Sequence, residues 1–352
     1  MRVVVGMSGG VDSSVAAWMM KQQGHEVLGV FMNNWEEQDD RGVCTAEKDW
    51  DDVRRVCDVI GIPYYSVNFA KEYKERVFAQ FLEEYRHFRT PNPDVLCNRE
   101  IKFNVFLNFA ESLGAEKLVT GHFANLDRKD GRYRLLRARD ENKDQTYFLY
   151  MLGQRALSKA CFPVGNLLKS EIREIARREG IPTSEKKDST GVCFIGERDF
   201  KAFLQNYLPA QGGDMVDESG RVVGHHDGLM YYTLGQRRGL GIGGGGNGER
   251  WFVIEKDVKN NRLVVSQGED MERLYTPCAY AAEATWLSGE APGRELDCMV
   301  RLRHRQPLQQ AHITVDGNRV HMEFAQRQRA VTPGQSAVFY LDQECLGGAI
   351  IE

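Results

Sequence analysis

The stretch RVVVGMSGGVDSS (residues 2–14) decides the fold of this chain. Its first four residues carry a run of valines that is typical of a buried strand, and glycines follow at once. From Gly9 to Gln23, apolar side chains recur at helical spacing, so the stretch predicts a strand, a glycine-rich turn and a helix. Glycines let a backbone approach an anion, and a helix N-terminus offers free N–H groups. We therefore predict a phosphate-binding loop, which is not a Walker A loop because the Gly-Lys-Ser/Thr ending is missing.

Strand and helix patterns alternate through the next hundred residues. Residues 27–32 predict a second strand, residues 50–60 a helix with one apolar face, and residues 118–122 a strand that ends in a loop. This alternation predicts a parallel sheet with helices on both faces. Ligands of such sheets bind beyond the carboxyl ends of the strands. The glycine-bearing turns after Val5 and Thr120 both lie at such ends.

The pattern changes near residue 200. Residues 211–250 are rich in glycine and predict either a flexible connector or a small domain that carries loops. Short segments of alternating polarity then predict a small β-barrel. A chain of 352 residues is also too long for one ordinary core. We predict an α/β fold with a nucleotide-binding domain over residues 1–200, a glycine-rich central domain over 201–270 and a C-terminal β-barrel over 271–352.

The overall composition is that of a globular protein in a reducing compartment. Hydrophobic residues make up 42% and charged residues 27%. No apolar run approaches the roughly 20 residues that cross a bilayer. The first residues lack the apolar core of a signal peptide, so we expect a cytoplasmic protein without a membrane partner. The eight cysteines contain no C-x-x-C pair, which weighs against a structural zinc or an iron–sulfur cluster.

Two basic clusters stand out against a formal net charge of −4. Residues 128–139 hold six basic side chains against one acidic side chain, and Arg301, Arg303, His304 and Arg305 form the second cluster. Each cluster fits two interpretations, a solvated surface and a contact with nucleic acid.

Two cysteines lie in segments that suggest reactivity. The segment TPNPDVLCN (residues 90–98) places the carboxylate of Asp94 three residues before the thiol of Cys97, just before a predicted helix. A cysteine near a helix start has its thiolate favoured. The segment DSTGVCFI (residues 188–195) presents Cys193 close to a glycine. By contrast, Cys57 and Cys298 lie on apolar faces, and we expect both in the core.

The loop of residues 6–13 resembles the PP-loop of the ATP pyrophosphatases, which split ATP between its α- and β-phosphates and adenylate a substrate oxygen. Together with both cysteine segments, further motifs make the whole chain resemble the tRNA-specific 2-thiouridylase family. The likeness is strong through residue 200 and looser in the last 80 residues. The further motifs are GHFA (121–124), KDQTYFL (143–149), GQRRGLG (235–241), RHRQ (303–306) and TPGQ (332–335).

The resemblance implies an enzyme that adenylates the 2-oxygen of the wobble uridine of tRNA with ATP. The oxygen is then replaced by sulfur from a cysteine persulfide, giving 2-thiouridine, AMP and pyrophosphate. Cys97 would be the nucleophile, Asp94 the acid–base residue and Cys193 the persulfide carrier, with a disulfide between the two cysteines after each transfer. A cysteine desulfurase or a sulfur-relay protein would donate the sulfur. The resemblance further implies ATP binding by Gly6, Met7, Ser8, Gly9, Gly10, Val11, Asp12, Ser13, Met32 and Gly121, contact with the target base by Asn92, Pro93 and Asp94, and contact with tRNA by Lys143, Asp144, Gln145, Arg303 and His304. The family often carries tyrosine where this chain has His304.

The chemistry requires these parts for a physical reason. A uridine carbonyl oxygen is a poor leaving group, so it must be activated, and a persulfide stores the sulfur until a second thiol takes up the disulfide. Mg²⁺ is expected with ATP because a hard cation offsets phosphate charge, and Asp12 is the predicted ligand. Two interpretations of His122 stand at this point, a contact with the nucleotide and a structural role. Two rival functions remain, a PP-loop ligase that adenylates a metabolite and a tRNA-binding protein in which ATP only stabilises the fold.

Overall fold

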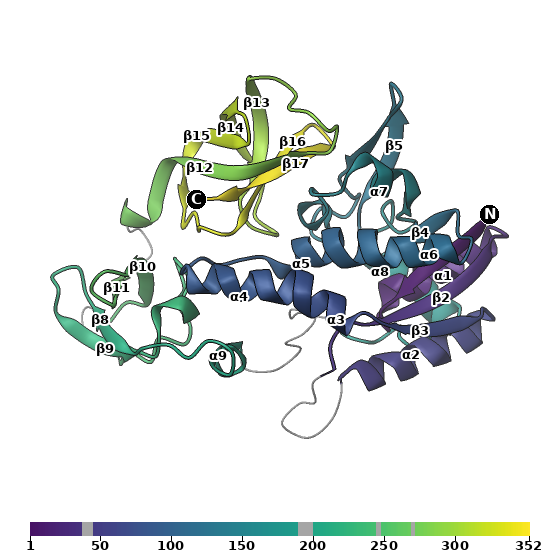
Figure 1. Ribbon diagram of the computed structural model, residues 1–352, viewed down its shortest axis with the longest axis horizontal. Helices are drawn as coiled ribbons and strands as arrows, with labels where there is room; N and C mark the ends of the chain where they lie inside the picture. The colour runs from purple at the N-terminus through teal and green to yellow at the C-terminus, as the bar shows by residue number, and fades with distance from the viewer. Residues whose placement is uncertain (37–44, 189–199, 244–247, 269–271) are drawn as a thin grey trace.

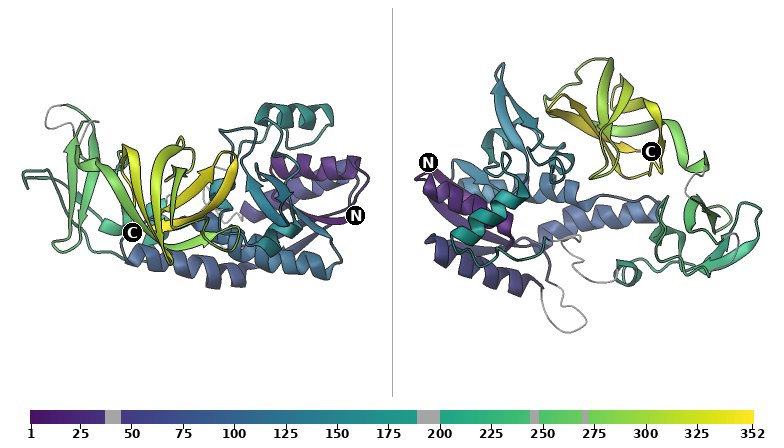
Figure 2. Two further views of the ribbon diagram at one scale, coloured as in Figure 1. Left: turned by 90° about the horizontal axis from the view of Figure 1, so that it is seen from above. Right: turned by 180° about the vertical axis from the view of Figure 1, so that it is seen from behind.

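The computed structural model describes residues 1–36, 45–188, 200–243, 248–268 and 272–352, which form three folded parts (Figures 1 and 2). The first part is built on a five-stranded parallel sheet with the order β3-β2-β1-β4-β7. The predicted parallel α/β sheet is therefore confirmed. Its strands are β1 (Arg2–Met7), β2 (Glu26–Asn33), β3 (Tyr64–Asn68), β4 (Lys117–Val119) and β7 (Ala160–Cys161).

Helices cover both faces of this sheet because successive apolar side chains of each strand point to opposite faces. Val3 and Val5 pack in one core with α1 (Val11–Gln22), α2 (Thr45–Ile60) and α8 (Lys169–Arg178). Val4 packs in a second core with two long helical runs on the other face. These runs are α3 (Ala70–Tyr73), π-helical η1 (Lys74–Phe78) and α4 (Ala79–Arg86), then α5 (Pro93–Leu96), π-helical η2 (Cys97–Phe106) and α6 (Leu107–Ser112).

A hairpin connects the first part to the barrel. Strand β6 (Arg132–Leu136) pairs with β5 (Asn125–Lys129) on one side and with β17 of the barrel on the other, with Leu135 opposite Cys345. The same region contains the 3₁₀ turn η3 (Thr146–Phe148) and α7 (Gln154–Lys159). Backbone hydrogen bonds thus join the hairpin, which follows β4 in the chain, to the barrel.

The central part is a folded domain. It contains α9 (Phe200–Gln205), and its sheet has the order β10-β11-β8-β9. Its core is apolar, with Met215, Val253, Leu263 and Val265 fully buried. Of the two alternatives for residues 211–250, the small domain is confirmed for the described residues. Its remaining elements are β8 (Gly213–Val216), β9 (Val222–His226), the 3₁₀ turn η4 (Leu229–Tyr231), β10 (Trp251–Asp257) and β11 (Arg262–Gln267).

The C-terminal part is the predicted β-barrel. Six antiparallel strands follow one another in the order β12-β15-β14-β13-β16-β17, and pairing of β12 with β17 closes the barrel. Figure 1 shows it above the run of α3, η1 and α4, which reaches from the parallel sheet to the central domain. The turn η5 (Glu272–Leu274) precedes β12 (Tyr275–Trp286), β13 (Glu295–Arg301), β14 (Gln309–Asp316), β15 (Arg319–Arg329), β16 (Ser336–Leu341) and β17 (Glu344–Ile351).

The fold also bears on the predicted burial of two cysteines and on the expected lack of a membrane span. The side chains of Cys57 and Cys298 are 0% and 5% exposed, so their predicted burial is confirmed. Burial raises the pKa of both thiols to about 12. Within the described ranges, the helices are all too short or too polar to traverse a lipid bilayer.

Candidate active site

The glycine-rich loop lies where the direction of the sheet topology reverses. From β1 the chain passes to β2 and β3 on one side, then returns to β4 on the other side of β1. Such a switch point is the usual ligand site of an open α/β sheet. Gly9 takes a φ of +70°, and a Cβ at Gly121, after β4, would lie 2.6 Å from the backbone nitrogen of Ser13. The two predicted turns therefore meet at the N-terminus of α1, and only glycine permits this approach at residue 121.

The hydroxyl groups of the loop hold its backbone in place. The Ser8 amide donates to Ser13 Oγ at 3.2 Å, and Ser13 Oγ donates to the Gly10 carbonyl at 3.1 Å. Gly10 is the N-cap of α1 and supplies no side-chain cap, so the first-turn N–H groups remain available to an anion. Met32 lies partly buried near the end of β2, and β1 runs directly into the loop. This arrangement fits the phosphates of a nucleotide.

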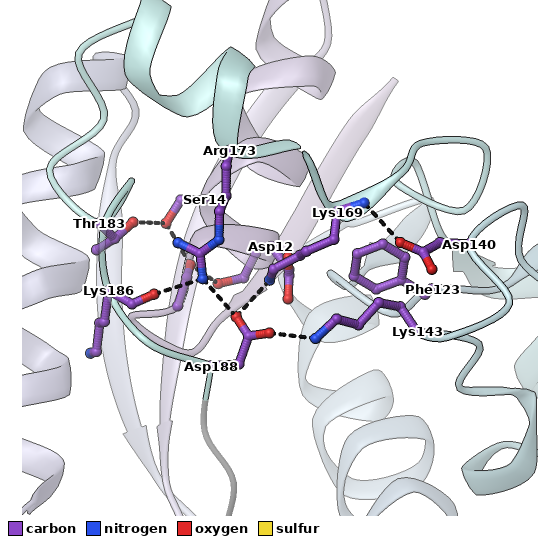
Figure 3. A network of polar contacts seen from close by, with 12 residues as sticks. Asp12, Ser14, Phe123, Asp140, Lys143, Lys169, Arg173, Thr183, Lys186 and Asp188 are labelled. Atoms are coloured by element: carbon purple, nitrogen blue, oxygen red, sulfur yellow. Dashed lines mark hydrogen bonds and ion pairs between the residues drawn. The ribbon is translucent and has the colours of Figure 1, made fainter. Parts of the chain in front are cut away.

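A network of charges surrounds Asp12 at the start of α1 (Figure 3). Lys169 Nζ lies 2.5 Å from Asp12 Oδ1 and 2.8 Å from Asp188 Oδ1, and Lys143 and Arg173 approach Asp188 at 2.6 and 3.1 Å. Burial raises the pKa of Asp12, and Lys169 opposes this shift. Burial would also raise the pKa of Asp188, but hydrogen bonds from Lys143 and Lys169 outweigh it and lower this pKa to about 2. Three cations against two carboxylates leave the network positive.

Lys169 contacts Asp12 of the loop, and no prediction was made for it from the sequence. It is the first residue of α8, where the helix dipole disfavours a cation. The run from Lys169 to Arg178 has Ile172, Ile175 and Ala176 at helical spacing, so a helix predicted there would have placed this lysine at its start. The network meets the needs of a polyphosphate with a hard cation, because it combines ammonium groups with the carboxylate oxygens that Mg²⁺ prefers.

Asp94 and Cys97 lie on one continuous helical run. Asn92 caps it by accepting a hydrogen bond from the Asp94 amide at 3.2 Å, and Pro93 occupies the first helical position. Residues three apart share a helix face, so the carboxyl group and the thiol lie on the same side. Cys97 is 1% exposed. Burial raises the pKa of Asp94, while nearby Lys102 lowers it.

The TPGQ motif of the barrel braces the segment before this helix. The Thr90 amide donates to the Pro333 carbonyl at 2.9 Å, and Gln335 Nε2 donates to the Thr90 carbonyl at 2.7 Å. Gly334 has a φ of +89°, and a Cβ there would lie 2.9 Å from the Thr90 nitrogen. The TPGQ motif had no predicted role, and the structure shows that it positions the segment before the predicted target-base residues.

The predicted tRNA contacts come together from two distant parts of the chain. Asp144 accepts from Arg301 at 2.7 Å, and the rings of Phe148 and His304 have centroids 4.5 Å apart. Arg303 is exposed and donates to Thr332 at 3.2 Å. Burial, followed by the neighbouring arginines, lowers the pKa of His304 to about 4.

The side chains of Asp144 and Gln145 bond to other parts of the protein and do not form an open contact surface. Asp144 is 1% exposed, and its carboxylate also accepts from the Ala138 amide and from Thr146 Oγ1. Gln145 Oε1 accepts from the Phe123 amide at 2.9 Å. Both side chains therefore hold the backbone around Lys143, whose ammonium group is partly exposed.

Known protein families resemble this chain along almost its whole length. Family models match a tRNA methyl transferase HUP domain over residues 1–197, a tRNA methyl transferase PRC-barrel domain over 201–267 and an aminomethyltransferase β-barrel domain over 277–351. A tRNA-specific 2-thiouridylase from Alkaliphilus oremlandii is 57% identical over 352 residues, which cover 100% of this chain and 97% of the relative. The chain belongs to the tRNA-specific 2-thiouridylase family. Another relative of the same description, from Geobacillus kaustophilus, is 55% identical over 100% of this chain and 94% of its own length.

The resemblance to the 2-thiouridylase family is thus confirmed. Among solved structures, a 4-thiouridine synthetase in complex with RNA and ATP aligns at 19% identity and a TM-score of 0.36. That alignment covers 58% of this chain and 49% of the other, a likeness too weak to support a functional argument.

Three further predictions concern Cys193, His122 and the basic cluster of residues 128–139. Cys193 lies outside the described residues. His122 is 8% exposed, bonds Thr120 Oγ1 at 2.8 Å and packs between two phenylalanine rings, which favours the structural role. In the 128–139 cluster, the paired side chains are Arg132 with Glu290, Arg134 with Glu344, Arg137 with Glu141, and Arg139 with Glu171, which favours an ion-paired surface.

Proposed function

We propose that this protein is an ATP-dependent tRNA sulfurtransferase that forms 2-thiouridine at the wobble position. The observation that carries the proposal is identity of 55–57% with tRNA-specific 2-thiouridylases along the whole chain. The site supports it, because a phosphate-binding loop and a helix bearing a carboxyl group and a thiol belong to the same domain. ATP use follows from the PP-loop, and a tRNA substrate is consistent with the cytoplasmic location that we propose.

Adenylation is the task of the loop. The first-turn amides of α1 and the positive network around Lys169 would bind the phosphates of ATP, with Met32 and Gly121 bordering the nucleotide. Asp12 would hold Mg²⁺, which offsets phosphate charge. The uridine 2-oxygen attacks the α-phosphate, the bond between the α- and β-phosphates breaks, and pyrophosphate leaves. Asn92 and Pro93 would surround the base, and Asp94, whose raised pKa suits proton transfer near neutral pH, would act as acid–base residue.

Sulfur transfer uses the two predicted cysteines. The terminal sulfur of a Cys193 persulfide, loaded by a cysteine desulfurase or a sulfur-relay protein, forms a bond to C2 of the uridine, and AMP leaves. The Cys97 thiolate then attacks Cys193 Sγ, and the electrons of the broken S–S bond pass to the sulfur on C2. The products are 2-thiouridine and a Cys97–Cys193 disulfide, and a two-electron reductant restores both thiols.

Binding of tRNA would use the surface around Lys143 and Arg303. Both side chains are at least partly exposed, and the Asp144–Arg301 pair holds their segments together. His304 would lie at the edge of this surface. We assign Asp144 and Gln145 to positioning, because their side chains already have protein partners.

Release of AMP tests this proposal against the two rival functions. With ATP and Mg²⁺, AMP and pyrophosphate should form only when unmodified tRNA is added, and Asp12→Asn should abolish their formation. Glu141→Gln, a change to an exposed carboxylate nearby, should leave the rate unchanged. Product formed without tRNA would indicate a ligase acting on a metabolite. No AMP under any condition would indicate a tRNA-binding protein that uses ATP only for stability.

A further inference from the structure

The GQRRGLG motif, which has no role in the proposed function, borders a cavity in the central domain. The cavity has a volume of about 360 Å³, within the usual range for small-ligand sites. Its large apolar lining side chains are Leu240, Ile242 and Trp251, the first residue of β10. Its polar lining side chains are Arg237, Glu249 and Arg250.

The two arginines of the cavity carry charge without a protein partner. Within the described part of the chain, neither Arg237 nor Arg250 forms a hydrogen bond or an ion pair through its guanidinium group. Elsewhere in the same domain, Arg221 pairs with Asp217 at 3.0 Å. Glu249 is the acid in the lining, so the cavity keeps a net positive charge.

Trp251 adds an aromatic ring to the lining. Its indole Nε1 is buried and has no hydrogen-bond partner among the described residues, so a ligand would meet the ring and not this donor. The guanidinium groups, the indole ring and the apolar side chains together match a ligand that combines an anionic group with an aromatic base.

The motif and the residues just before it contact the target-base segment and the barrel. Thr233, two residues before the motif, bonds Thr90 through their Oγ1 atoms at 3.3 Å, and Thr90 lies two residues before Asn92, the first target-base residue. A Cβ at Gly235 would lie 2.9 Å from Cβ of Ala330 in the barrel. The cavity is therefore joined to the active site by one short segment.

We propose that this cavity binds one unstacked nucleotide of the RNA substrate, with its phosphate on Arg237 and Arg250 and its base against Trp251. Single-stranded segments are the usual targets of such sites, because splayed bases stack on aromatic rings while arginines follow the backbone. The inference rests on the proposed function, since it takes tRNA as the substrate.

The test measures tRNA binding by the full-length protein over a range of salt concentrations. The double variant Arg237→Gln/Arg250→Gln removes the phosphate contacts. A matched control, Lys259→Gln/Arg262→Gln, removes two charges from the opposite end of the β10–β11 hairpin, since Trp251 pairs with Gln267 and Asp257 with Arg262. Thermal unfolding midpoints confirm that each variant is folded.

We expect the double variant to raise the Kd for unmodified tRNA about 10-fold and to reduce the slope of log K against log salt by about 1 to 2. The control should change both quantities little. Trp251→Ala should weaken binding about 10-fold without changing the slope, because it removes the ring against which the base stacks.

Equal effects of the double variant and its control would overturn the proposal, because net charge alone would then explain them. So would loss of AMP binding with unchanged tRNA binding, which would indicate a site for free nucleotides. If the wild-type protein binds tRNA and the double variant binds it equally well, only this inference fails. If the wild-type protein does not bind tRNA at all, the proposed function fails as well.

Discussion

Replacement of Asp144 by asparagine should loosen the joint between the catalytic domain and the barrel. The side chains of Asp144 and Arg301 are 0% and 5% exposed, and their polar atoms meet at 2.7 Å. Arg301 Nε already lacks a hydrogen-bond partner among the described residues. Loss of the carboxylate charge leaves the guanidinium buried over the ring of Tyr340 with poor compensation. Breaking a buried pair in this way costs about 3–5 kcal/mol.

Urea unfolding measures this cost. With a slope of about 3 kcal/mol/M, the urea midpoint should fall by about 1 to 1.7 M. Arg301→Met should cost a similar amount, but the double variant should cost much less than the sum, because replacing both partners removes the unpaired charge. Glu141→Gln, which breaks an exposed pair, should shift the midpoint by less than about 0.3 M.

A different outcome would refute this reasoning about Asp144. If Asp144→Asn leaves the urea midpoint unchanged while weakening tRNA binding as strongly as a change at Lys143, the carboxylate contacts tRNA directly. Its burial against Arg301 would then be irrelevant to its role.

Three other changes have definite expected results. Gly121→Ala should lower tRNA-dependent AMP release about 100-fold, since its Cβ would lie 2.6 Å from the Ser13 nitrogen and displace the loop, whereas Gly153→Ala, with open space around it, should be neutral. Asp94→Asn should abolish thiolation yet raise the free energy of unfolding at pH 7. Burial raises the pKa of the Asp94 carboxyl, and such a group disfavours folding once the pH exceeds the pKa that it has in the unfolded chain. An unchanged or lower free energy of unfolding would contradict this. The pKa of His304 is about 4 when folded and about 6.5 when unfolded, so stability should be lost as pH falls through that window. His304→Phe should lose about 1 kcal/mol less than the wild type between pH 7 and pH 5 in urea unfolding, and equal losses would contradict this.

Local sequence was sufficient where a short segment determines its own structure. The loop after β1 is one example, because valines, glycines and a helical pattern follow one another directly, and the structure shows that strand, turn and helix. Cys57 is another, because its place on an apolar helix face already indicated burial. The barrel strands were likewise visible from alternating polarity.

Features formed between distant segments could not be predicted from sequence. Asp144 is buried by Arg301, 157 residues further along the chain, and nothing near residue 144 indicates that partner. Four arginines of the 128–139 cluster are paired with acids, two of which, Glu290 and Glu344, come from the barrel region. A count of local charge therefore overstated the free positive charge of this hairpin.

The central claim is that Cys97 frees the sulfur bound to C2 of the uridine from Cys193 and so completes 2-thiouridine, and sulfur transfer measured in a single turnover tests it most directly. Enzyme loaded with labelled persulfide is mixed with ATP and unmodified tRNA, and 2-thiouridine and AMP are quantified by mass spectrometry. The wild-type protein and Cys278→Ser, a change to a partly exposed barrel cysteine, should give one labelled 2-thiouridine per loaded sulfur. Cys97→Ser should adenylate the tRNA but yield no 2-thiouridine. Labelled 2-thiouridine formed by Cys97→Ser at the wild-type rate would contradict the account.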